Sequence, residues 1–323
     1  MKKKTIVTLV LLVVLVLLVI LGARTILGSR TANNEPTRIY ITNHTSYNTL
    51  CDDIGANVYF RLMTRALGLY GKQVRPGSYV IEPHMRNLTL VRKLRNGQQD
   101  PIRLTIGKFR TPEQLNEYLN DKLMHDDFKV TLDSFYIIRP NTYEFYWTVT
   151  PENFMERMEK EYQRFWGKKD LKDLKDLKDS KDLKDPKDLT ILASIVEEET
   201  NNNAEKPLIA SVYINRLKKG MPLQADPTVK YAVGDFTLRR ILNKHLDAES
   251  PFNTYLHTGL PPEPICLPSD ASVDAVINAP LTNYIYFCAS DKMDGTHRFA
   301  TTLAEHNRNA AAFHHALNKK GIK

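Results

Sequence analysis

Cysteine is scarce in this chain, with only Cys51, Cys266 and Cys288 among 323 residues. There is no CxxC pair and no cluster with metal-ligand spacing, and His297 and His306 are too far apart for a helical metal pair. Three cysteines permit one disulfide, but their spacing does not identify it. We therefore expect no disulfide framework and no metal site.

Acidic residues are outnumbered, because 45 lysines and arginines against 37 aspartates and glutamates leave a formal net charge of +8. A basic balance suits nucleic acid, an anionic membrane surface or an acidic polymer as partner. The length of 323 residues predicts about two domains beyond any anchor. The 42% of hydrophobic residues is enough to build a core.

Charge is absent from Thr5 to Ala23, an apolar run that follows the lysine cluster at residues 2–4. The run is close to the ~20 residues that cross a bilayer as a helix. The lysines favour a cytoplasmic N-terminus, with the main body on the extracytoplasmic (periplasmic) side. A cleaved signal peptide is the alternative, but its apolar core usually has about 7–15 residues. We predict a retained single-pass anchor in the cell (inner) membrane, a location that argues against nucleic acid as a partner.

The remaining chain divides by composition into a tether and two folded parts. Residues 1–23 form the cytoplasmic tip and anchor, 24–36 a polar tether, 37–100 a small mixed module, and 101–323 a larger domain. The small module has the strand and helix signals of a compact carbohydrate-binding module or of a folded spacer.

A Lys-Asp-Leu repeat with a period of three occupies residues 168–189. On a helix each repeat turns the leucine by about −60°, so no continuous apolar face forms. Pro186 interrupts the repeat. We interpret this segment as a solvated insertion or linker and not as a binding site.

Three consecutive glutamates follow an apolar stretch and do not share one helix face. Read as a helix, the stretch places Glu199 near the middle of an apolar stripe and turns Glu197 and Glu198 away by roughly 120–160°. The stripe consists of Leu189, Leu192, Ile195 and Val196. A carboxyl group on such a stripe is costly unless it is paired, protonated or functional, and desolvation raises its pKa toward neutrality. The pattern nominates Glu199 as a general acid; the alternative is a surface charge where the stripe opens to solvent.

Five sequence blocks carry a more specific signal. They are Ala193–Thr200, Ala210–Leu217, Leu223–Val229, the pair Asn253–Tyr255 with Thr258–Pro262, and His297-x-Phe299 with His306-Asn307. In order and spacing these blocks resemble the endolytic murein transglycosylases, the YceG-like family. The anchor and the small module are arranged as in that family, where the module looks like a LysM-type fold. The resemblance is strong after Thr190 and weak before it.

The resemblance implies an α+β protein with a transmembrane helix, a LysM-like module and a mixed α/β catalytic domain. It implies cleavage of the MurNAc–GlcNAc bond within nascent peptidoglycan glycan strands, leaving 1,6-anhydro-MurNAc ends. The partners implied are peptidoglycan strands and the synthases that make them. Two features depart from the pattern: the Lys-Asp-Leu repeats precede the catalytic helix, and Asn201–Asn203 replace the usual mixture after it, whereas Glu205 is retained.

The family motif makes Glu199 the catalytic acid, and a lytic transglycosylase needs no metal or cofactor. Glu199 would protonate the glycosidic oxygen and then accept the proton of the sugar's C6 hydroxyl. Asp226 is the second carboxylate, either stabilising the positive transition state, binding sugar hydroxyls, or serving only as a turn residue before Pro227.

The other candidate substrate-binding residues are Gln224, Asn253, Tyr255 and His297, each of which could instead be structural. His297 and His306 suit a pocket wall or core, with sugar contact as the next interpretation. Two other functions remain open: a non-catalytic wall-binding scaffold, and a muramidase-type hydrolase that uses Glu199 with Asp226 on water.

Overall fold

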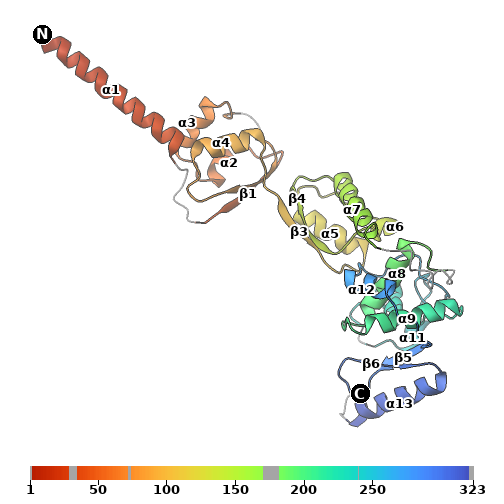
Figure 1. Ribbon diagram of the computed structural model, residues 1–323. Coiled ribbons are helices and arrows are strands. Elements are labelled where there is room, and N and C mark those ends of the chain that lie inside the picture. Colours follow the sequence, from red (N-terminus) through yellow and green to blue (C-terminus); the bar gives the residue numbers. More distant parts are fainter. Residues whose placement is uncertain (1, 29–34, 72–73, 170–181, 239, 320–323) are drawn as a thin grey trace. The chain divides into compact units, whose positions relative to one another are not determined.

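The computed structural model describes residues 2–28, 35–71, 74–169, 182–238 and 240–319 (Figure 1). Helices and strands are mixed, as an α+β protein requires, and an apolar helix begins the chain. The chain separates into two compact units. One comprises Met1–Leu104, Asn120–Asp126 and Tyr143–Thr150, and the other comprises Thr105–Leu119, Asp127–Thr142 and Pro151–Lys323. The three cysteines are free thiols.

The first unit begins with the long helix α1 (Lys2–Leu27), of which Thr5–Leu27 is long and apolar enough to cross a membrane. The elements that follow are β1 (Thr37–Ile41), α2 (Tyr47–Asp53), α3 (Val58–Ala66), β2 (Gly77–Ile81) and α4 (Asn87–Asn96). Strands β1 and β2 pair antiparallel, with Ile39 opposite Tyr79. Their buried side chains pack with those of α2, α3 and α4 into one core.

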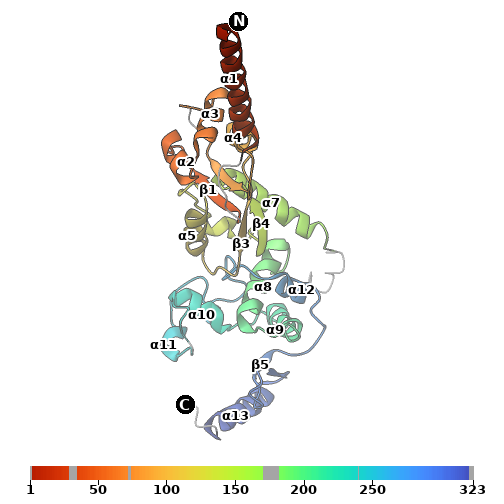
Figure 2. The same ribbon diagram turned by 90° about the vertical axis from the view of Figure 1, so that its left-hand side faces the viewer.

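Helix α1 extends into the segment expected as a tether. It continues to Leu27, and the backbone N–H of Asn87 donates to the carbonyl of Gly28 at 2.9 Å. Helix α1 also contacts α3 and α4, as Figures 1 and 2 both show. Residues 29–34 of the expected tether lie outside the described part of the chain.

Further helices and strands follow in chain order. They are β3 (Ile102–Ile106), α5 (Pro112–Lys122), α6 (Leu132–Phe135), β4 (Asn141–Phe145), α7 (Pro151–Trp166), α8 (Pro186–Glu199), α9 (Lys206–Lys218), α10 (Asp226–Val233), α11 (Asn243–Leu246), α12 (Asp270–Ile277), β5 (Tyr286–Ala289), β6 (His297–Ala300) and α13 (Leu303–Lys319). Strand β3 pairs with β4, and β5 pairs with β6 in antiparallel register.

Helix α8 is the centre of the second unit. All eight residues from Leu189 to Val196 are buried, and α9, α10 and α12 pack against the helix. The single apolar stripe expected from the sequence therefore underestimates the contact of this helix, which is enclosed on every side. Ala193 and Ser194 fill the remaining faces because their small side chains admit neighbouring backbones closely.

The start of α8 lies inside the segment that we interpreted as a solvated insertion. Pro186 is the first residue of the helix, where its missing N–H is not needed, and Asp185 caps the backbone N–H groups of Lys187 and Asp188. Leu183 and Leu189 are only 4% and 2% exposed and belong to the core. Residues 170–181, which hold most of the repeat, lie outside the described residues.

Replacing Leu192 by alanine should destabilise the second unit by about 2–5 kcal/mol, because the leucine is fully buried and the cavity left behind cannot collapse completely. The measurement is hydrogen exchange of the α8 amides in the full chain, which reports on this unit alone. Leu281→Ala removes the same atoms from a side chain that is 76% exposed and should leave exchange unchanged. Equal protection in the two variants would contradict a central role for α8.

Candidate functional site

A cavity of about 420 Å³ opens at the C-terminal end of α8. One wall comes from α8, α9, the start of α10 and the loop at Tyr255, and the other from β5, β6 and the start of α13. The lining residues are Glu199, Tyr213, Arg216, Leu223, Gln224, Asp226, Tyr255, Tyr286, Phe287, Cys288, Ala289, His297, Leu303 and His306. The cavity thus collects residues from all five of the sequence blocks named above.

Glu199 is the last residue of α8, and its carboxyl group belongs to the cavity wall. Burial raises the pKa of Glu199 to about 7, the hydrogen bond from Tyr213 acts in the opposite direction, and the charge of Asp226 raises it further. A carboxyl group with this pKa is present in both protonation states near neutral pH. It can therefore give up a proton and take one back.

Tyr213 on α9 donates its hydroxyl hydrogen to Oε1 of Glu199. The tyrosine is 2% exposed, and burial followed by the nearby charge of Glu199 raises its pKa, so the hydroxyl keeps its proton. Because Oε1 accepts this bond, Oε2 is the oxygen left to carry the acidic proton. The tyrosine therefore fixes both the orientation of the carboxyl group and the position of its proton.

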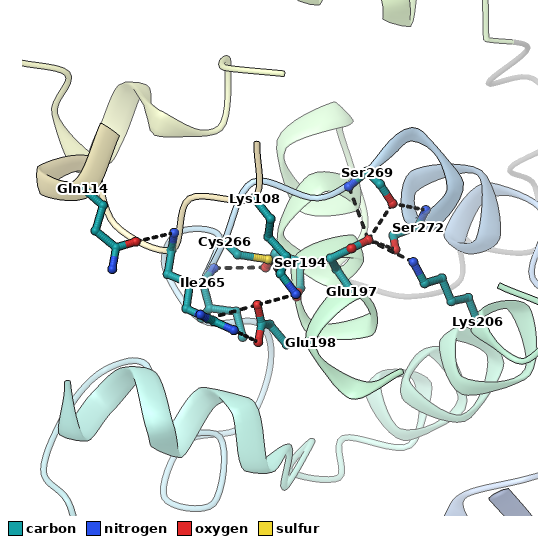
Figure 3. Close-up of polar contacts among 11 residues, drawn as sticks. Lys108, Gln114, Ser194, Glu197, Glu198, Lys206, Ile265, Cys266, Ser269 and Ser272 are labelled. Atoms are coloured by element: carbon teal, nitrogen blue, oxygen red, sulfur yellow. Dashed lines mark hydrogen bonds and ion pairs between the residues drawn. The ribbon is translucent and has the colours of Figure 1, made fainter. Parts of the chain in front are cut away.

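Glu197 does not belong to the cavity wall, and three side-chain donors hold its carboxylate (Figure 3). Its Oε2 accepts from Ser269 Oγ at 2.6 Å, Ser272 Oγ at 2.5 Å and Lys206 Nζ at 3.0 Å. Burial alone would raise the pKa of Glu197, but these three donors outweigh it and lower the pKa. The carboxylate thus ties the end of α8 to the first turns of α9 and α12.

Glu198 makes a second set of ion pairs on another side of α8 (Figure 3). Arg110 donates to both of its carboxylate oxygens, from Nε at 3.2 Å and Nη2 at 3.0 Å, and Lys108 Nζ lies 3.2 Å from Oε1. The bidentate geometry is the strong form of this pairing. One turn earlier on α8, Ser194 Oγ accepts from the backbone N–H of Ile265 at 3.0 Å. The sequence predicted that Glu197 and Glu198 point away from the apolar stripe, but it did not indicate which residues they pair with.

Gln224 is held in an unusual backbone conformation with φ = 49°. Its backbone N–H donates to the carbonyl of Thr254 at 3.0 Å, and its Oε1 accepts from Arg216 Nη1 at 3.3 Å. Because a guanidinium can only donate, the side-chain NH₂ of Gln224 remains as the donor available to a ligand. A non-glycine residue at positive φ costs free energy, which the surrounding bonds must offset.

Arg216 is a lining residue that the sequence reasoning did not nominate. It is buried, and it donates to the carbonyls of Leu223 at 2.8 Å and Ile285 at 2.7 Å, joining the two walls. Its guanidinium also lies over the ring of Tyr286, 5.3 Å from the centroid. The signal available in the sequence was its place in the block Ala210–Leu217, on the same helix as Tyr213.

Asp226 opens α10 and reaches the cavity as its second carboxylate. Tyr255 donates its hydroxyl hydrogen to Oδ1 at 2.7 Å, and burial followed by this bond raises the pKa of Tyr255. The position before Pro227 makes Asp226 a helix-start residue as well, where the helix dipole favours a negative charge. Each carboxylate of the cavity is therefore oriented by one tyrosine.

Asn253 does not line the cavity. It is fully buried, and its Nδ2 donates to the carbonyls of Leu246 at 2.8 Å and Ala248 at 2.9 Å, while Oδ1 accepts from the backbone N–H of Tyr255 at 3.0 Å. These bonds use the donors and one acceptor of the side chain. The residue shapes the loop that presents Tyr255, and its amide does not face the space where a ligand would bind.

His297 lies on β6 and contributes to the opposite wall. Its backbone N–H donates to Glu205 Oε1 at 2.9 Å, and its Nδ1 lies 3.0 Å from Glu205 Oε2. The carboxylate favours a proton on Nδ1, so the neutral ring has Nε2 as its acceptor. His306 also lines the cavity, stacked on Tyr286 at 5.3 Å, and burial lowers its pKa.

Comparisons with known proteins were made on sequence and on structure. The sequence model of the YceG-like family matches residues 39–312. A protein of Bacillus subtilis (strain 168) named endolytic murein transglycosylase is 45% identical over 132 residues, which is 41% of this chain and 36% of that protein. One with the same name from Streptococcus pneumoniae serotype 2 is 34% identical over 127 residues, 38% of this chain and 23% of that protein. The matched part thus spans about a third or less of these relatives.

A crystal structure of a YceG-like protein from Listeria monocytogenes is also similar. It has a TM-score of 0.50 and 27% sequence identity, and the match covers 85% of this chain and 99% of that one.

Tyr213→Phe should raise the pKa of Glu199 above about 7, because the substitution removes a hydrogen bond that stabilises the charged carboxylate. The titration midpoint of Glu199 therefore moves to higher pH. The measurement is the side-chain carboxyl ¹³C shift as a function of pH, assigned by comparison with Glu199→Gln. Tyr286→Phe removes a hydroxyl from the opposite wall and serves as the control. An unchanged midpoint in Tyr213→Phe would mean that this bond does not act on the carboxyl group.

Lys206→Met should destabilise the second unit by about 3–5 kcal/mol at pH 7, because it leaves Glu197 as a buried carboxylate without its cation. The folded-state pKa of Glu197 is lowered, so its stabilisation is present above the unfolded pKa and is lost as pH falls through the folded one. The difference between the variant and the wild type should therefore shrink in acid. Hydrogen exchange of α8 at several pH values measures it, with the exposed Lys219→Met as control. A difference that grows in acid would contradict this reading.

Proposed function

The chain belongs to the YceG-like family, and on that premise we propose that it is a membrane-anchored lytic transglycosylase of peptidoglycan. It cuts the MurNAc–GlcNAc bond within nascent glycan strands and leaves 1,6-anhydro-MurNAc ends. The observation that carries the proposal is Glu199, a carboxyl group with a pKa of about 7, oriented by Tyr213 in the wall of an open cavity. The names of the relatives from Bacillus subtilis and Streptococcus pneumoniae support the same activity.

Glu199 acts first as the acid. The proton on Oε2 passes to the glycosidic oxygen while the bond from C1 of MurNAc to that oxygen breaks, and its electron pair stays on the leaving GlcNAc oxygen. Positive charge develops on the ring oxygen and C1 of MurNAc. Burial supplies the protonated form that this step needs, because it raises the pKa of the group toward the working pH.

Glu199 then acts as the base. The C6 hydroxyl oxygen of the same MurNAc attacks C1, and its proton returns to the carboxylate, which restores the starting enzyme. No water is consumed, so the second carboxylate that hydrolases use to activate water is not required for this step. Tyr213 keeps its bond to Oε1 throughout and stabilises the carboxylate between the two transfers. The reaction uses no cofactor.

The remaining cavity residues bind and orient the sugar. Asp226, with Oδ1 engaged by Tyr255, places negative charge near the developing oxocarbenium ion. The side-chain NH₂ of Gln224 donates to sugar or acetamido oxygens, and Nε2 of His297 accepts from a hydroxyl or amide N–H. Tyr255 offers the edge of its ring to the sugar, in addition to its hydrogen bond to Asp226. Asn253 acts indirectly, by positioning the loop that carries Tyr255.

The N-terminal part supplies the location. We infer that α1 is a single-pass anchor with a cytoplasmic N-terminus, which places the catalytic unit on the extracytoplasmic side. The element order β1–α2–α3–β2, with β1 and β2 paired, supports a LysM-like module that holds glycan. Cell-wall synthases are the partners that this location favours.

Asp226 also favours a second candidate, a muramidase-type hydrolase in which this carboxylate activates water. The two reactions leave different ends: an anhydro ring from transglycosylation and a reducing sugar from hydrolysis. The product therefore decides between them. A non-catalytic wall-binding scaffold would leave neither.

Glu199→Gln should abolish formation of anhydro ends from purified peptidoglycan, with a loss of at least about 10²–10⁴-fold, because the amide cannot transfer the proton. Wild-type activity should fall as pH rises through about 7, where Glu199 loses its proton. Products are identified by mass spectrometry. The fold should persist, since the variant removes a desolvated carboxylate, and Glu156→Gln on the exposed side of α7 is the control.

Three results would contradict the proposal. Reducing ends from the wild type would establish the hydrolase. No product from a folded wild-type protein that still binds peptidoglycan would leave only the scaffold. Full activity in Glu199→Gln would place the acid elsewhere.

A further inference from the structure

We propose that helix α3, together with the exposed arginines of α4, is a membrane-docking face through which the small module rests on anionic phospholipid headgroups. The inference rests on the membrane anchor proposed above and goes beyond it. It assigns a lipid-binding surface to the folded module itself, in addition to the helix that spans the bilayer.

The length of α1 brings the module to the lipid surface. The apolar span Thr5–Leu27 has 23 residues, which at 1.5 Å per residue reach about 34 Å, against a hydrocarbon core of about 30 Å. The helix therefore ends within about one turn of the hydrocarbon boundary. The Gly28 carbonyl, one residue beyond α1, already accepts a hydrogen bond from the N–H of Asn87, the first residue of α4.

Helices α3 and α4 both contact α1, and Figures 1 and 2 show them beside its C-terminal end. The hydrogen bond between Asn87 and Gly28 joins this end of α1 directly to the folded module. Elements packed against the end of a spanning helix lie at the level of the lipid headgroups. The surface that α3 presents there must be compatible with that layer.

Helix α3 presents apolar side chains outward. Val58 is 61% exposed and Leu62, one turn later, is 37% exposed, whereas Phe60 and Met63 on the other side of the helix are buried in the module core. Ala66 continues the exposed side after a further turn. A short helix with an outward apolar side, attached to a membrane span, has the form of an interfacial helix.

The polar groups beside this apolar side are positive. Arg61 and Arg65 flank it, and neither α3 nor α4 contains an acidic residue. Arg61 pairs with Asp52 at 3.5 Å, and the pair is weak because both side chains are exposed. Arg65 lies over the ring of Tyr70, which is 51% exposed and suited to the interfacial layer.

Helix α4 extends the positive surface. Arg86, Arg92 and Arg95 are exposed on or beside it, and Arg86 precedes the residue that is bonded to the end of α1. Lys93 is excluded from this face, since it is paired with Asp100 at 2.7 Å. Anionic lipids attract such residues within about a Debye length of the surface.

A lipid surface accounts for these features together, and a soluble anionic polymer does not. A wall polymer would explain the arginines, but it would leave Val58 and Leu62 exposed to water. Phospholipid supplies phosphates for the arginines and acyl chains for the apolar side chains at one depth. The contact of both helices with the membrane span favours the same occupant.

The test is lipid photo-crosslinking in the full-length chain, reconstituted in vesicles of phosphatidylcholine alone or mixed with phosphatidylglycerol. Benzoylphenylalanine replaces Leu62, and lipid adducts are identified by mass spectrometry. We expect phosphatidylglycerol adducts at this position in the mixed vesicles. The same probe at Leu15, within the span, reports whether α1 itself is inserted.

Two variants separate the charged from the apolar part of the face. Arg61→Gln with Arg65→Gln should reduce the phosphatidylglycerol adduct by about fivefold for each charge removed. Arg103→Gln, whose side chain is 81% exposed on β3, is the control and should have no effect. Val58→Asp should also reduce the adduct, while α3 itself is retained, because Val58 is the first helical residue, where the dipole favours a carboxylate.

Each result has one meaning. Adducts at Leu15 without adducts at Leu62 would overturn the docking face and leave the anchor intact. No adduct at either position would overturn the anchor on which the inference rests. Equal adducts with both lipids, unaffected by the arginine variants, would overturn the recognition of anionic headgroups. None of these results bears on whether Glu199 forms anhydro ends, which is measured separately.

Discussion

The enclosure of α8 is the constraint on which the second unit depends. A helix buried on all sides from Leu189 to Val196 has to place the charged side chains of its last turn among donors. The three glutamates of that turn find donors in three directions. Glu197 accepts from two serines and a lysine, Glu198 from an arginine and a lysine, and Glu199 from Tyr213 at the cavity wall. The bonds of Glu197 and Glu198 hold the helix end in place. The carboxyl group of Glu199 is left in the cavity wall, where it is incompletely solvated.

This division explains why the pKa values of Glu197 and Glu199 shift in opposite directions. Glu197 receives three charged or hydroxyl donors, so its ionised form is favoured despite burial. Glu199 receives one neutral donor and faces the charge of Asp226, so burial dominates and its pKa rises. The same helix end therefore contains carboxyl groups with opposite shifts. The raised pKa of Glu199 thus occurs beside two carboxylates that other residues neutralise.

The sequence nominated Glu199 and the blocks that meet around it, and the roles of these residues remain predictions. The cavity that Glu199 lines is also lined by Gln224, Asp226, Tyr255 and His297. Helix periodicity could not predict this grouping, because it relates Glu199 only to the apolar stripe of its own helix. Asn253 shows where sequence reasoning stops, because a motif position does not reveal whether an amide faces a ligand or its own loop. Arg216 and Lys206 were missed for a related reason: buried cations are recognised only when their partners, distant in sequence, are known.

Boundaries were the least predictable part of the fold. The repeat read as a solvated insertion ends inside α8, since a proline that would break a helix interior is favourable at its first position. The expected tether is partly helix, because packing against α3 and α4 stabilises the end of α1. The two differences have different causes: local capping at Asp185 and Pro186 in one case, and tertiary contacts of α1 in the other. The module's LysM-like identity and the limits of the domains remain predictions.

The backbone of Gln224 shows what the cavity costs the fold. A glycine at φ = 49° would be unstrained, but it has no carboxamide to accept from Arg216 or to donate to a sugar. The bonds to Thr254 and Arg216 hold the strained residue in place and fix the direction of its side-chain NH₂. Under the proposed function, the strained backbone is the cost of one fixed donor.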